Sequence, residues 1–352
     1  MKLLEKLLRN KKILYVGIGI LILLIILVLW LTRKPSETHI PNIKDDEPTK
    51  EVEEKKEVNI VNTNSTSRPY AVMINNAGVA RKLQSGLQDA YIIYEIIVEG
   101  GLTRYMALFL DQQTERIGSV RSARHYYLDY ALENDAIYVH HGQSPQAQSD
   151  FSSLNIDRIV ADNSKTGWRD KTLDVASEHT LFTSIEKLNN GLGKKRTTRE
   201  KDLLLNYSAD EINLQDMSGA LAASNVKIKY SDSVTSSYEY DSEAKVYKRS
   251  VNGKAHKDYV TGKQYTFKNI IAYDVDNYNL NDGENKGRQG IDNIGSGTGY
   301  YITNGYAIPI TWEKSKRESQ TIYKDKNGNE ITVNDGNTFI QIYPTDGEIK
   351  LS

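Results

Sequence analysis

The chain has 352 residues, a length at which two folded domains are the usual expectation. Its 45 basic and 46 acidic residues leave a formal net charge of −1, so no overall positive field indicates a nucleic-acid partner. There is no cysteine, which excludes disulfides, thiol catalysis, iron–sulfur clusters, cysteine zinc sites and the lipidated cysteine of a lipoprotein signal. This composition suits an exported protein that folds without oxidation.

The amino terminus has the pattern of a membrane anchor. Residues 1–12 contain five basic residues and one acidic residue, and residues 13–32 form an uncharged, mostly apolar stretch long enough to span a bilayer. The exit of this stretch, Leu31-Thr32-Arg33-Lys34-Pro35, lacks the small residues of a signal-peptidase site. The heavier basic cluster places the amino-terminal side in the cytoplasm. We therefore predict a cytoplasmic basic tail over 1–12, a single uncleaved transmembrane helix (a signal anchor) over 13–32, and an extracellular remainder.

The composition changes after the anchor. Residues 33–67 are rich in Pro, Glu, Lys and Asn and poor in apolar residues, so they have little to offset the entropy of ordering. We predict a flexible linker over 33–67. The rest is predicted to fold as an α/β (α+β) layered domain over 68–215 and a β-rich domain over 216–352.

Strand-like and helix-like segments alternate in the first domain, which is why we assign it to the α/β class. Ser144-Pro145 marks a helix start, because serine caps well and proline is favoured in the first turn. Strands are expected over 69–75, 91–98, 102–110, 136–140 and 156–161, and helices over 84–90, from Ser122 onward, over 144–154 and over 180–189.

The second domain alternates apolar and polar residues in short runs, a pattern typical of strands with one exposed face. Asn252-Gly253 and Asn327-Gly328 are hairpin turn signals. The glycine-rich stretch 295–299 is expected to form a bend between strands. Strands are expected over 226–230, 238–240, 246–249, 270–275, 299–303, 307–312, 321–324 and 338–343.

A charged residue, Glu95, lies within the apolar strand expected over 91–98. If Gly100-Gly101 forms the whole turn to the next strand, the register is set by that two-residue loop. Side chains alternate along a strand, so Glu95, Glu99 and Arg104 would share one face. We therefore predict that the Arg104 guanidinium lies between the two carboxylates.

Three arginines, Arg116, Arg121 and Arg124, surround Ser122, the expected N-cap of a helix. Basic residues at that end oppose the helix dipole. Guanidinium groups and free backbone N–H groups bind phosphate or carboxylate well, so these residues and Arg104 are candidates for an anion-binding site. The alternative is a structural network in which the arginines pair with Glu95, Glu99, Asp111 and Glu115.

Two other pairs of residues are candidates for lining a pocket. Glu95 and Glu99 are about 13 Å apart along a strand that rises about 3.3 Å per residue, whereas glycosidase carboxylates are about 5–9.5 Å apart. His140 and His141 are neighbours on a strand and point to opposite faces, which does not suit one metal ion. We predict no metal and no cofactor, and we identify no catalytic motif.

Five longer motifs are spread over the folded part of the chain: RPYAVMINN at 68–76, YEIIVEGGLTRYMALF at 94–109, IGSVRSARHYYLDYALENDAIYVHHG at 117–142, GSGTGYYITNGYAIPITWEK at 295–314 and DGNTFIQIYP at 335–344. In these motifs the chain resembles the YerB-like family of membrane-attached extracytoplasmic proteins of Gram-positive bacteria. The resemblance implies a two-domain extracytoplasmic protein of a family with no settled biochemical activity. Members are commonly lipoproteins and often have Pro-His-Asn where this chain has Glu178-His179-Thr180.

These observations predict a membrane-anchored extracytoplasmic protein of the cell envelope. We expect it to bind an anionic wall component, a lipid-linked ligand or an envelope protein partner, without nucleic acid. The alternative is an envelope enzyme, either a peptidoglycan hydrolase or a transferase acting on phosphate-linked glycans. An enzyme needs an acid–base group or a nucleophile beside the arginines, whereas a binding protein needs only the arginines.

The predicted topology can be tested with protease on intact cells stripped of their wall. Residues beyond about position 35 should be digested, and a short stub should be protected because a span needs about 20 residues. Recovery of a soluble ectodomain with a new terminus near residue 32 would instead indicate a cleaved signal peptide.

Overall fold

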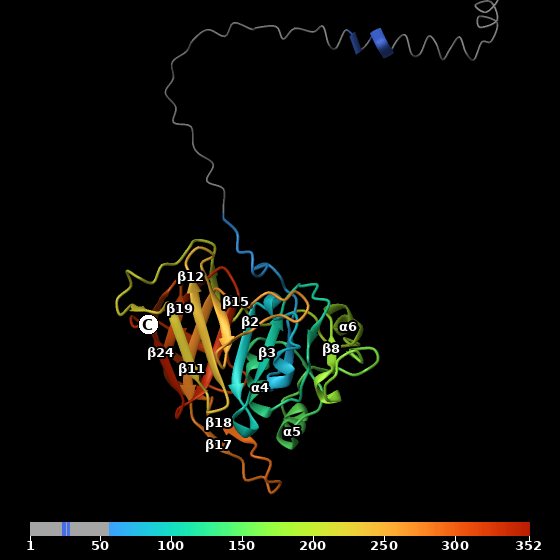
Figure 1. Ribbon diagram of the computed structural model, residues 1–352, viewed down its shortest axis with the longest axis vertical. Coiled ribbons are helices and arrows are strands. Elements are labelled where there is room, and N and C mark those ends of the chain that lie inside the picture. The colour runs from blue at the N-terminus through green and yellow to red at the C-terminus, as the bar shows by residue number, and fades with distance from the viewer. Residues whose placement is uncertain (1–22, 26, 29–55) are drawn as a thin grey trace, which may run out of the picture. The chain divides into compact units, whose positions relative to one another are not determined.

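The computed structural model describes residues 23–25, 27–28 and 56–352. The expected basic tail, most of the expected anchor and residues 33–55 of the expected linker lie outside them. Residues 23–25 and 27–28 are helical. Within the described ranges, no helix combines the length and the apolar character needed to span a bilayer. Residues 56–352 belong to one compact unit (Figure 1).

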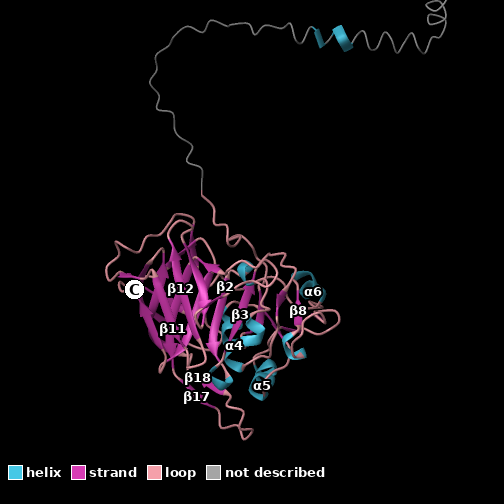
Figure 2. Cartoon of the chain, viewed as in Figure 1, coloured by secondary structure: helices cyan, strands magenta, loops and turns pink. Residues whose placement is uncertain are grey.

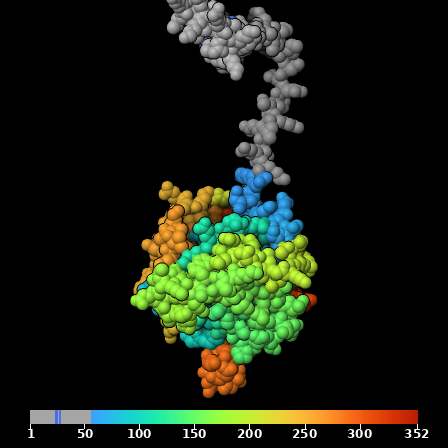
Figure 3. Space-filling view, turned by 90° about the vertical axis from the view of Figure 1, so that its right-hand side faces the viewer, coloured from blue at the N-terminus to red at the C-terminus, as the bar shows by residue number. Residues whose placement is uncertain are grey.

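The compact unit begins within the segment expected to be linker. Val61 is only 3% exposed. The Asp335 carboxylate accepts the backbone N–H groups of Asn59 and Ile60 at 3.0 and 2.9 Å. Residues 56–67 therefore pack on the folded unit. Figure 3 shows them in blue, at the end opposite to a projecting segment in orange that contains β17 (Asn277–Asn279) and β18 (Gln289–Ile291).

A mixed sheet of eleven strands, counted over the described residues, runs through the whole unit. Its order is β10-β20-β19-β16-β23-β2-β3-β1-β5-β6, with β21 paired to β20. The strands are β1 (Tyr70–Asn75), β2 (Ile92–Ile97), β3 (Thr103–Phe109), β5 (Ile137–His140), β6 (Arg158–Val160), β10 (Leu221–Ala222), β16 (Asn269–Val275), β19 (Gly295–Thr303), β20 (Tyr306–Lys314), β21 (Ile322–Lys324) and β23 (Thr338–Pro344).

The α/β character of the amino-terminal part and the β-rich character of the carboxy-terminal part are confirmed, but the two parts share this sheet. Strand β2 pairs in parallel with β23, from Ile92 opposite Thr338 to Ile96 opposite Ile342. Strands β1, β2 and β23 are buried along their whole length. This double burial explains why their sequences are nearly continuous apolar runs.

A second sheet covers one face of the main sheet (Figure 2). The ring of Phe339 in β23 contacts Tyr238 and Phe267 of the second sheet edge-on, at centroid distances of 6.1 and 4.8 Å. The strand order of the second sheet is β14-β13-β12-β11-β24, with β15 paired to β13. The strands are β11 (Asn225–Lys229), β12 (Thr235–Asp241), β13 (Val246–Val251), β14 (Lys254–Ala255), β15 (Thr266–Phe267) and β24 (Glu348–Leu351).

Helix α4 (His125–Glu133) packs against the same central strands through tyrosines. The Tyr126 hydroxyl donates to the Ile97 carbonyl at 2.7 Å, and the Tyr130 and Tyr94 rings lie 5.1 Å apart. The other α-helices within residues 56–352 are α3 (Gly78–Arg81), α5 (Pro145–Ser153) and α6 (Ile185–Asn190). Short strands complete the unit: β4 (Ile117–Gly118), β7 (Trp168–Arg169) and β8 (Leu181–Thr183) form one small sheet, and β9 (Asn206–Ser208) pairs with β22 (Thr332–Asn334).

Three expected elements differ in the structure. The segment 84–90 contains only a 3-10 turn, Leu87–Asp89, and 180–189 splits into β8 and α6 because Ser184 caps a new helix by accepting the Lys187 N–H. Residues 295–299 belong to strand β19 and not to a bend. Its glycines leave room for neighbours, since a Cβ on Gly297 would lie 2.6 Å from Trp312 Nε1.

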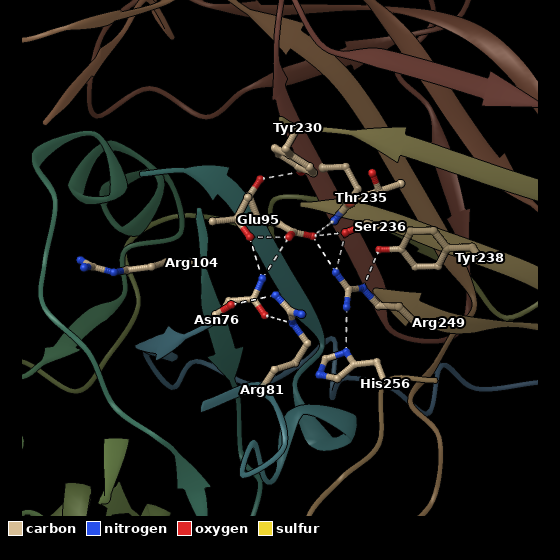
Figure 4. A network of polar contacts seen from close by, with 12 residues as sticks. Asn76, Arg81, Glu95, Arg104, Tyr230, Thr235, Ser236, Tyr238, Arg249 and His256 are labelled. Atoms are coloured by element: carbon tan, nitrogen blue, oxygen red, sulfur yellow. Dashed lines mark hydrogen bonds and ion pairs between the residues drawn. The ribbon is translucent and has the colours of Figure 1, made fainter. Parts of the chain in front are cut away.

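The turn between β2 and β3 overturns the predicted register. A 3-10 turn over Glu99–Gly101 is closed by a bond from the Leu102 N–H to the Glu99 carbonyl, and the Val98 N–H donates to the Leu102 carbonyl across the base of this three-residue loop. Glu95 therefore lies opposite Tyr105, and Arg104 lies opposite Ile96. A shift of one residue moves a side chain to the other face of a sheet. Arg104 is thus not between Glu95 and Glu99, and Figure 4 shows it pointing away from Glu95.

Glu95 instead forms a buried ion pair with Arg249 of β13 (Figure 4). The two side chains are 0% exposed, and Arg249 Nη2 lies 2.7 Å from Glu95 Oε2. The remaining acceptor positions of the carboxylate are also occupied, by donors from Thr103, Ser236, Gln341 and Asn76. We call these residues with Glu95 and Arg249 the buried network. It joins the two parts of the chain through one carboxylate.

Removing the arginine of this network should destabilise the whole unit. Arg249→Met leaves a buried carboxylate without its counter-charge, which should cost about 3–5 kcal/mol of unfolding free energy. The matched control is Lys248→Met, because Lys248 pairs with Asp241 at a partly exposed position and should change stability by about 1 kcal/mol or less. Urea unfolding at pH 7 measures both.

Adding Glu95→Gln to Arg249→Met should recover part of the loss, because the neutral amide needs no counter-charge. If Arg249→Met and Lys248→Met unfold at the same urea concentration, the buried pair does not hold the two parts together.

Candidate functional site

The candidate site lies at one edge of the main sheet. Strands β16, β23, β2, β1, β5 and β6 point the same way, because β1 and β2 are both antiparallel to β3 and the other pairings between them are parallel. Their carboxyl ends therefore meet at one edge, where α/β sheets place ligand sites. Residues 56–67, which lead into β1, enter from the opposite edge.

The segment 117–124, which begins with β4, is inserted between the carboxyl ends of β1 and β5. On one side the Arg121 N–H donates to the Met73 carbonyl at 2.9 Å. On the other side the His141 N–H donates to the Arg121 carbonyl at 3.1 Å, and the Ala123 N–H donates to the Gly142 carbonyl at 3.0 Å. The backbone of the segment is thus fixed at both flanks, and it carries Arg121 and Arg124 to the sheet edge.

Three of the four predicted arginines gather here: Arg104 from the start of β3, and Arg121 and Arg124 from the inserted segment. We call them the arginine cluster. Arg124 forms a bidentate pair with Glu99 at 2.5 and 2.8 Å, and Arg104 Nη2 is 3.8 Å from the same carboxylate. Arg121 Nη2 lies 3.1 Å from Glu178 Oε2. Three guanidinium groups therefore share two carboxylates.

The charges of the cluster are unequally compensated. Burial, with the neighbouring Arg124 as the next cause, lowers the pKa of Arg104 to about 10. Burial by itself would raise the pKa of Glu99, but the guanidinium groups of Arg124 and Arg104 outweigh it and hold that pKa below its ordinary value. The hydrogen bond from Arg121 likewise lowers the pKa of Glu178. Both carboxylates stay ionised near neutral pH, so neither is suited to donate a proton.

Polar groups that the sequence reasoning did not assign to the site extend this edge. His179 Nδ1 is 2.9 Å from Asn75 Nδ2, and His179 Nε2 is 3.4 Å from Glu178 Oε1. The signal for them was present, since Asn75 ends a strand and Glu178 and His179 are adjacent in a loop. Their approach to Arg121 could not be inferred, because 57 residues separate Arg121 from Glu178.

Ser122 does not have the predicted role. Helix α4 begins at His125, and its N-cap is Arg124, which makes no capping hydrogen bond through its side chain. Ser122 contributes its carbonyl, which accepts from Arg104 Nη1 at 2.6 Å. The arginines therefore precede the helix start and are held by Glu99 and by backbone carbonyls.

Arg116 has other partners. Its Nη1 is 2.9 Å from Asp170, and its guanidinium lies 3.6 Å from the centre of the Phe182 ring. It also lines a groove of about 680 Å³ between the turn that contains Gln88, the loop before β4 and the turn that contains Thr261. Arg116 is thus held in a structural pair, and the alternative of a structural network applies to it, although with a different acid from those considered.

The two histidines lie in separate surroundings. Buried His140 donates from Nδ1 to the Gly142 carbonyl at 2.8 Å, and its Nε2 is 3.3 Å from Arg158. His141 donates from Nδ1 to the Ala161 carbonyl, and its Nε2 is 3.1 Å from Arg169. Among the residues that the structure describes, no group of three or more histidines and acids is placed to hold a metal ion. Glu95 is enclosed in the buried network and lines no pocket with Glu99.

The fold and the site define a class of protein: an α/β domain and a β-rich domain built on one mixed sheet, with an arginine cluster at the carboxyl edge of its parallel strands. The description "Protein of unknown function (DUF3048) N-terminal domain" matches residues 57–198, and its "C-terminal domain" counterpart matches residues 226–340. The chain belongs to this DUF3048 family.

Two comparisons with individual proteins agree with this assignment. The chain is 32% identical over 283 residues to "Putative lipoprotein YerB" of Bacillus subtilis (strain 168), covering 79% of this chain and 81% of that protein. The crystal structure of YerB protein from Bacillus subtilis matches with a TM-score of 0.68 at 30% identity, covering 81% of this chain and 94% of the other. The resemblance to the YerB-like family is confirmed.

The buried His140 should make stability depend on pH. Burial lowers its pKa to about 4 from an ordinary 6.5, so the folded state disfavours the proton that the unfolded state accepts. The neutral state of buried His140 therefore gives its full contribution to the unfolding free energy above pH 6.5. That contribution, about 3 kcal/mol in all, is lost as the pH falls from 6.5 towards 4. His140→Gln should lose less unfolding free energy than the wild type between pH 7.5 and 4.5, measured in urea. Equal losses would show that folding does not lower the pKa of His140.

Proposed function

We propose that this protein is a membrane-attached extracytoplasmic protein of the cell envelope whose arginine cluster binds an anionic group of an envelope component. The observation that supports the binding role is the unequal charge at the sheet edge. Arg104 is only 8% exposed and shares its nearest carboxylate with Arg124. A guanidinium that is buried and incompletely paired favours an additional anion, because an uncompensated buried charge is costly.

The cluster has the chemistry that anion recognition needs. Guanidinium groups present planar pairs of donors that match the oxygens of phosphate or carboxylate. Arg104 and Arg124 are held by Glu99 and by backbone carbonyls, so they are oriented before a ligand arrives. Arg121 has the most exposed side chain of the three, at 25%. It is therefore the member that a ligand in solution can reach.

Membrane attachment rests on two observations. The Bacillus subtilis relative is named a putative lipoprotein. The present chain has no cysteine to carry a lipid, but residues 13–32 have the composition of a transmembrane helix. We therefore propose that a helical anchor attaches this protein to the membrane, in the way that a lipid attaches a lipoprotein. In the folded unit, the arginine cluster lies at the edge of the sheet opposite to the chain's entry at residues 56–67.

Calorimetry of the folded unit with soluble phosphate-bearing wall fragments tests the binding role. Binding should weaken between 50 and 200 mM salt, because exposed charges are screened. Arg121→Gln with Arg124→Gln should reduce the affinity at least tenfold, about 1.4 kcal/mol or more. Lys326→Gln with Lys350→Gln removes the same net charge from exposed positions and should leave the affinity unchanged.

The single variant Arg121→Gln keeps the Arg124–Glu99 pair, so it still tests binding if the double variant fails to fold. No binding by the wild type would refute the anion site and would direct the search to a protein partner. Equal losses in the cluster variant and the lysine control would show that only net charge matters.

A further inference from the structure

Glu178 is a carboxylate at the rim of the arginine cluster. It lies in a 3-10 turn, Ser177–His179, and its side chain is 55% exposed. Glu99, the other carboxylate that contacts the arginine cluster, is only 20% exposed and accepts hydrogen bonds from two nitrogen atoms of Arg124. Glu99 is therefore a fixed part of the fold, whereas Glu178 occupies a position that solvent and ligands can reach.

Glu178 is bound to Arg121, the most exposed arginine of the cluster. Arg121 Nη2 is 3.1 Å from Glu178 Oε2, and Arg121 Nη1 is 3.5 Å from the Glu178 carbonyl. In Arg124, by contrast, Nε and Nη2 contact Glu99 and Nη1 donates to the Ala123 carbonyl. An anion that approaches Arg121 therefore meets a negative charge already in place.

The charges in contact set a limit on the charge of the ligand. Three guanidinium groups and two carboxylates leave the cluster with one uncompensated positive charge while Glu178 is in place. A phosphodiester carries one negative charge. A phosphomonoester carries nearly two at pH 8, since its second pKa is about 6. Attraction by the arginines and repulsion from Glu178 both grow with the charge of the ligand. A singly charged ligand neutralises the one uncompensated positive charge, whereas a doubly charged ligand leaves an excess negative charge beside Glu178 and loses more hydration on binding.

We propose that the ligand of the arginine cluster is a phosphodiester and that Glu178 determines this specificity by excluding doubly charged phosphomonoesters. This inference rests on the proposed function, because it takes the cluster to be an anion site. It adds the chemical class of the ligand and the residue that selects it. Phosphodiesters occur both in phosphate-linked wall polymers and in lipid headgroups, and the site recognises the chemistry they share.

Calorimetry at pH 8 with two small probes tests the selectivity. The probes are bis-glycerol phosphate, a diester, and glycerol 3-phosphate, a monoester. The wild type should bind the diester at least tenfold more tightly. Glu178→Gln should bind both probes more tightly than the wild type, with the larger gain for the monoester, so that the preference falls at least fivefold. Glu239→Gln removes an exposed carboxylate from β12 and should leave the preference unchanged.

The outcomes separate this inference from the proposed function. If both proteins bind both probes with an unaltered ratio, Glu178 does not select the ligand, while the anion site stands. If the wild type binds neither probe nor wall fragments, the anion site itself is refuted. Glu178→Ala repeats the test should the glutamine amide keep a hydrogen bond to Arg121.

A second arm identifies the source of the diester. The folded unit is mixed with vesicles of phosphatidylglycerol, and separately with a soluble polymer of glycerol phosphodiesters. Loss of binding in Arg121→Gln is required in whichever arm is positive. Sedimentation with the vesicles alone assigns a lipid headgroup, and binding of the polymer alone assigns a wall component. Vesicle binding that Arg121→Gln leaves intact would contradict the proposal.

Discussion

The ion pair between Glu95 and Arg249 is the interaction on which the rest of the structure depends. Both side chains are fully buried, and 154 residues separate them in the chain. Removing two charges from water is costly, and the attraction between them offsets that cost only with good geometry and with partners for every remaining donor and acceptor. The buried network supplies those partners from β3, β12 and β23, and from Asn76 directly after β1. The face of the central sheet that carries Glu95 therefore has to pack against the second sheet, because only that sheet brings Arg249 to the carboxylate.

A second buried pair acts near the opposite face of the same sheet. Lys314 in β20 is 2.8 Å from Glu133 at the end of α4, and Glu133 also accepts from Thr321 and from the Tyr94 hydroxyl. The amino-terminal and carboxy-terminal parts are thus joined by two desolvated ion pairs and by the parallel pairing of β2 with β23. The two family domains behave as one folded unit, and the β2–β3 hairpin that carries Glu99 and Arg104 is held rigidly at the sheet edge.

The two charged regions of this hairpin differ in how completely their charges are paired. In the buried network every carboxylate oxygen of Glu95 has donors, and burial, then the charge of Arg249, lowers the pKa of the neighbouring His256 well below its ordinary value. At the sheet edge, three arginines share two acids, and the pKa of Arg104 is lowered by burial and by Arg124. Complete pairing builds structure, whereas incomplete pairing at an accessible edge leaves capacity for a ligand.

The sequence alone determined the features that depend on neighbouring residues. Apolar runs indicated strands buried on two faces, the alternation over 226–230 indicated a strand with one exposed face, and Ser144-Pro145 began a helix as predicted. The closeness of Arg121 and Arg124 was likewise visible, because only two residues lie between them.

The tertiary structure decided the features that depend on which faces meet. A three-residue turn in place of a two-residue turn set the register of β3, and so moved Arg104 away from Glu95. The partners of Glu95 and Arg121 come from strands and turns far along the chain, and local pattern carries no information about them. Side-chain alternation has a period of two, so one residue in a turn was enough to exchange the partners of every charge in the hairpin.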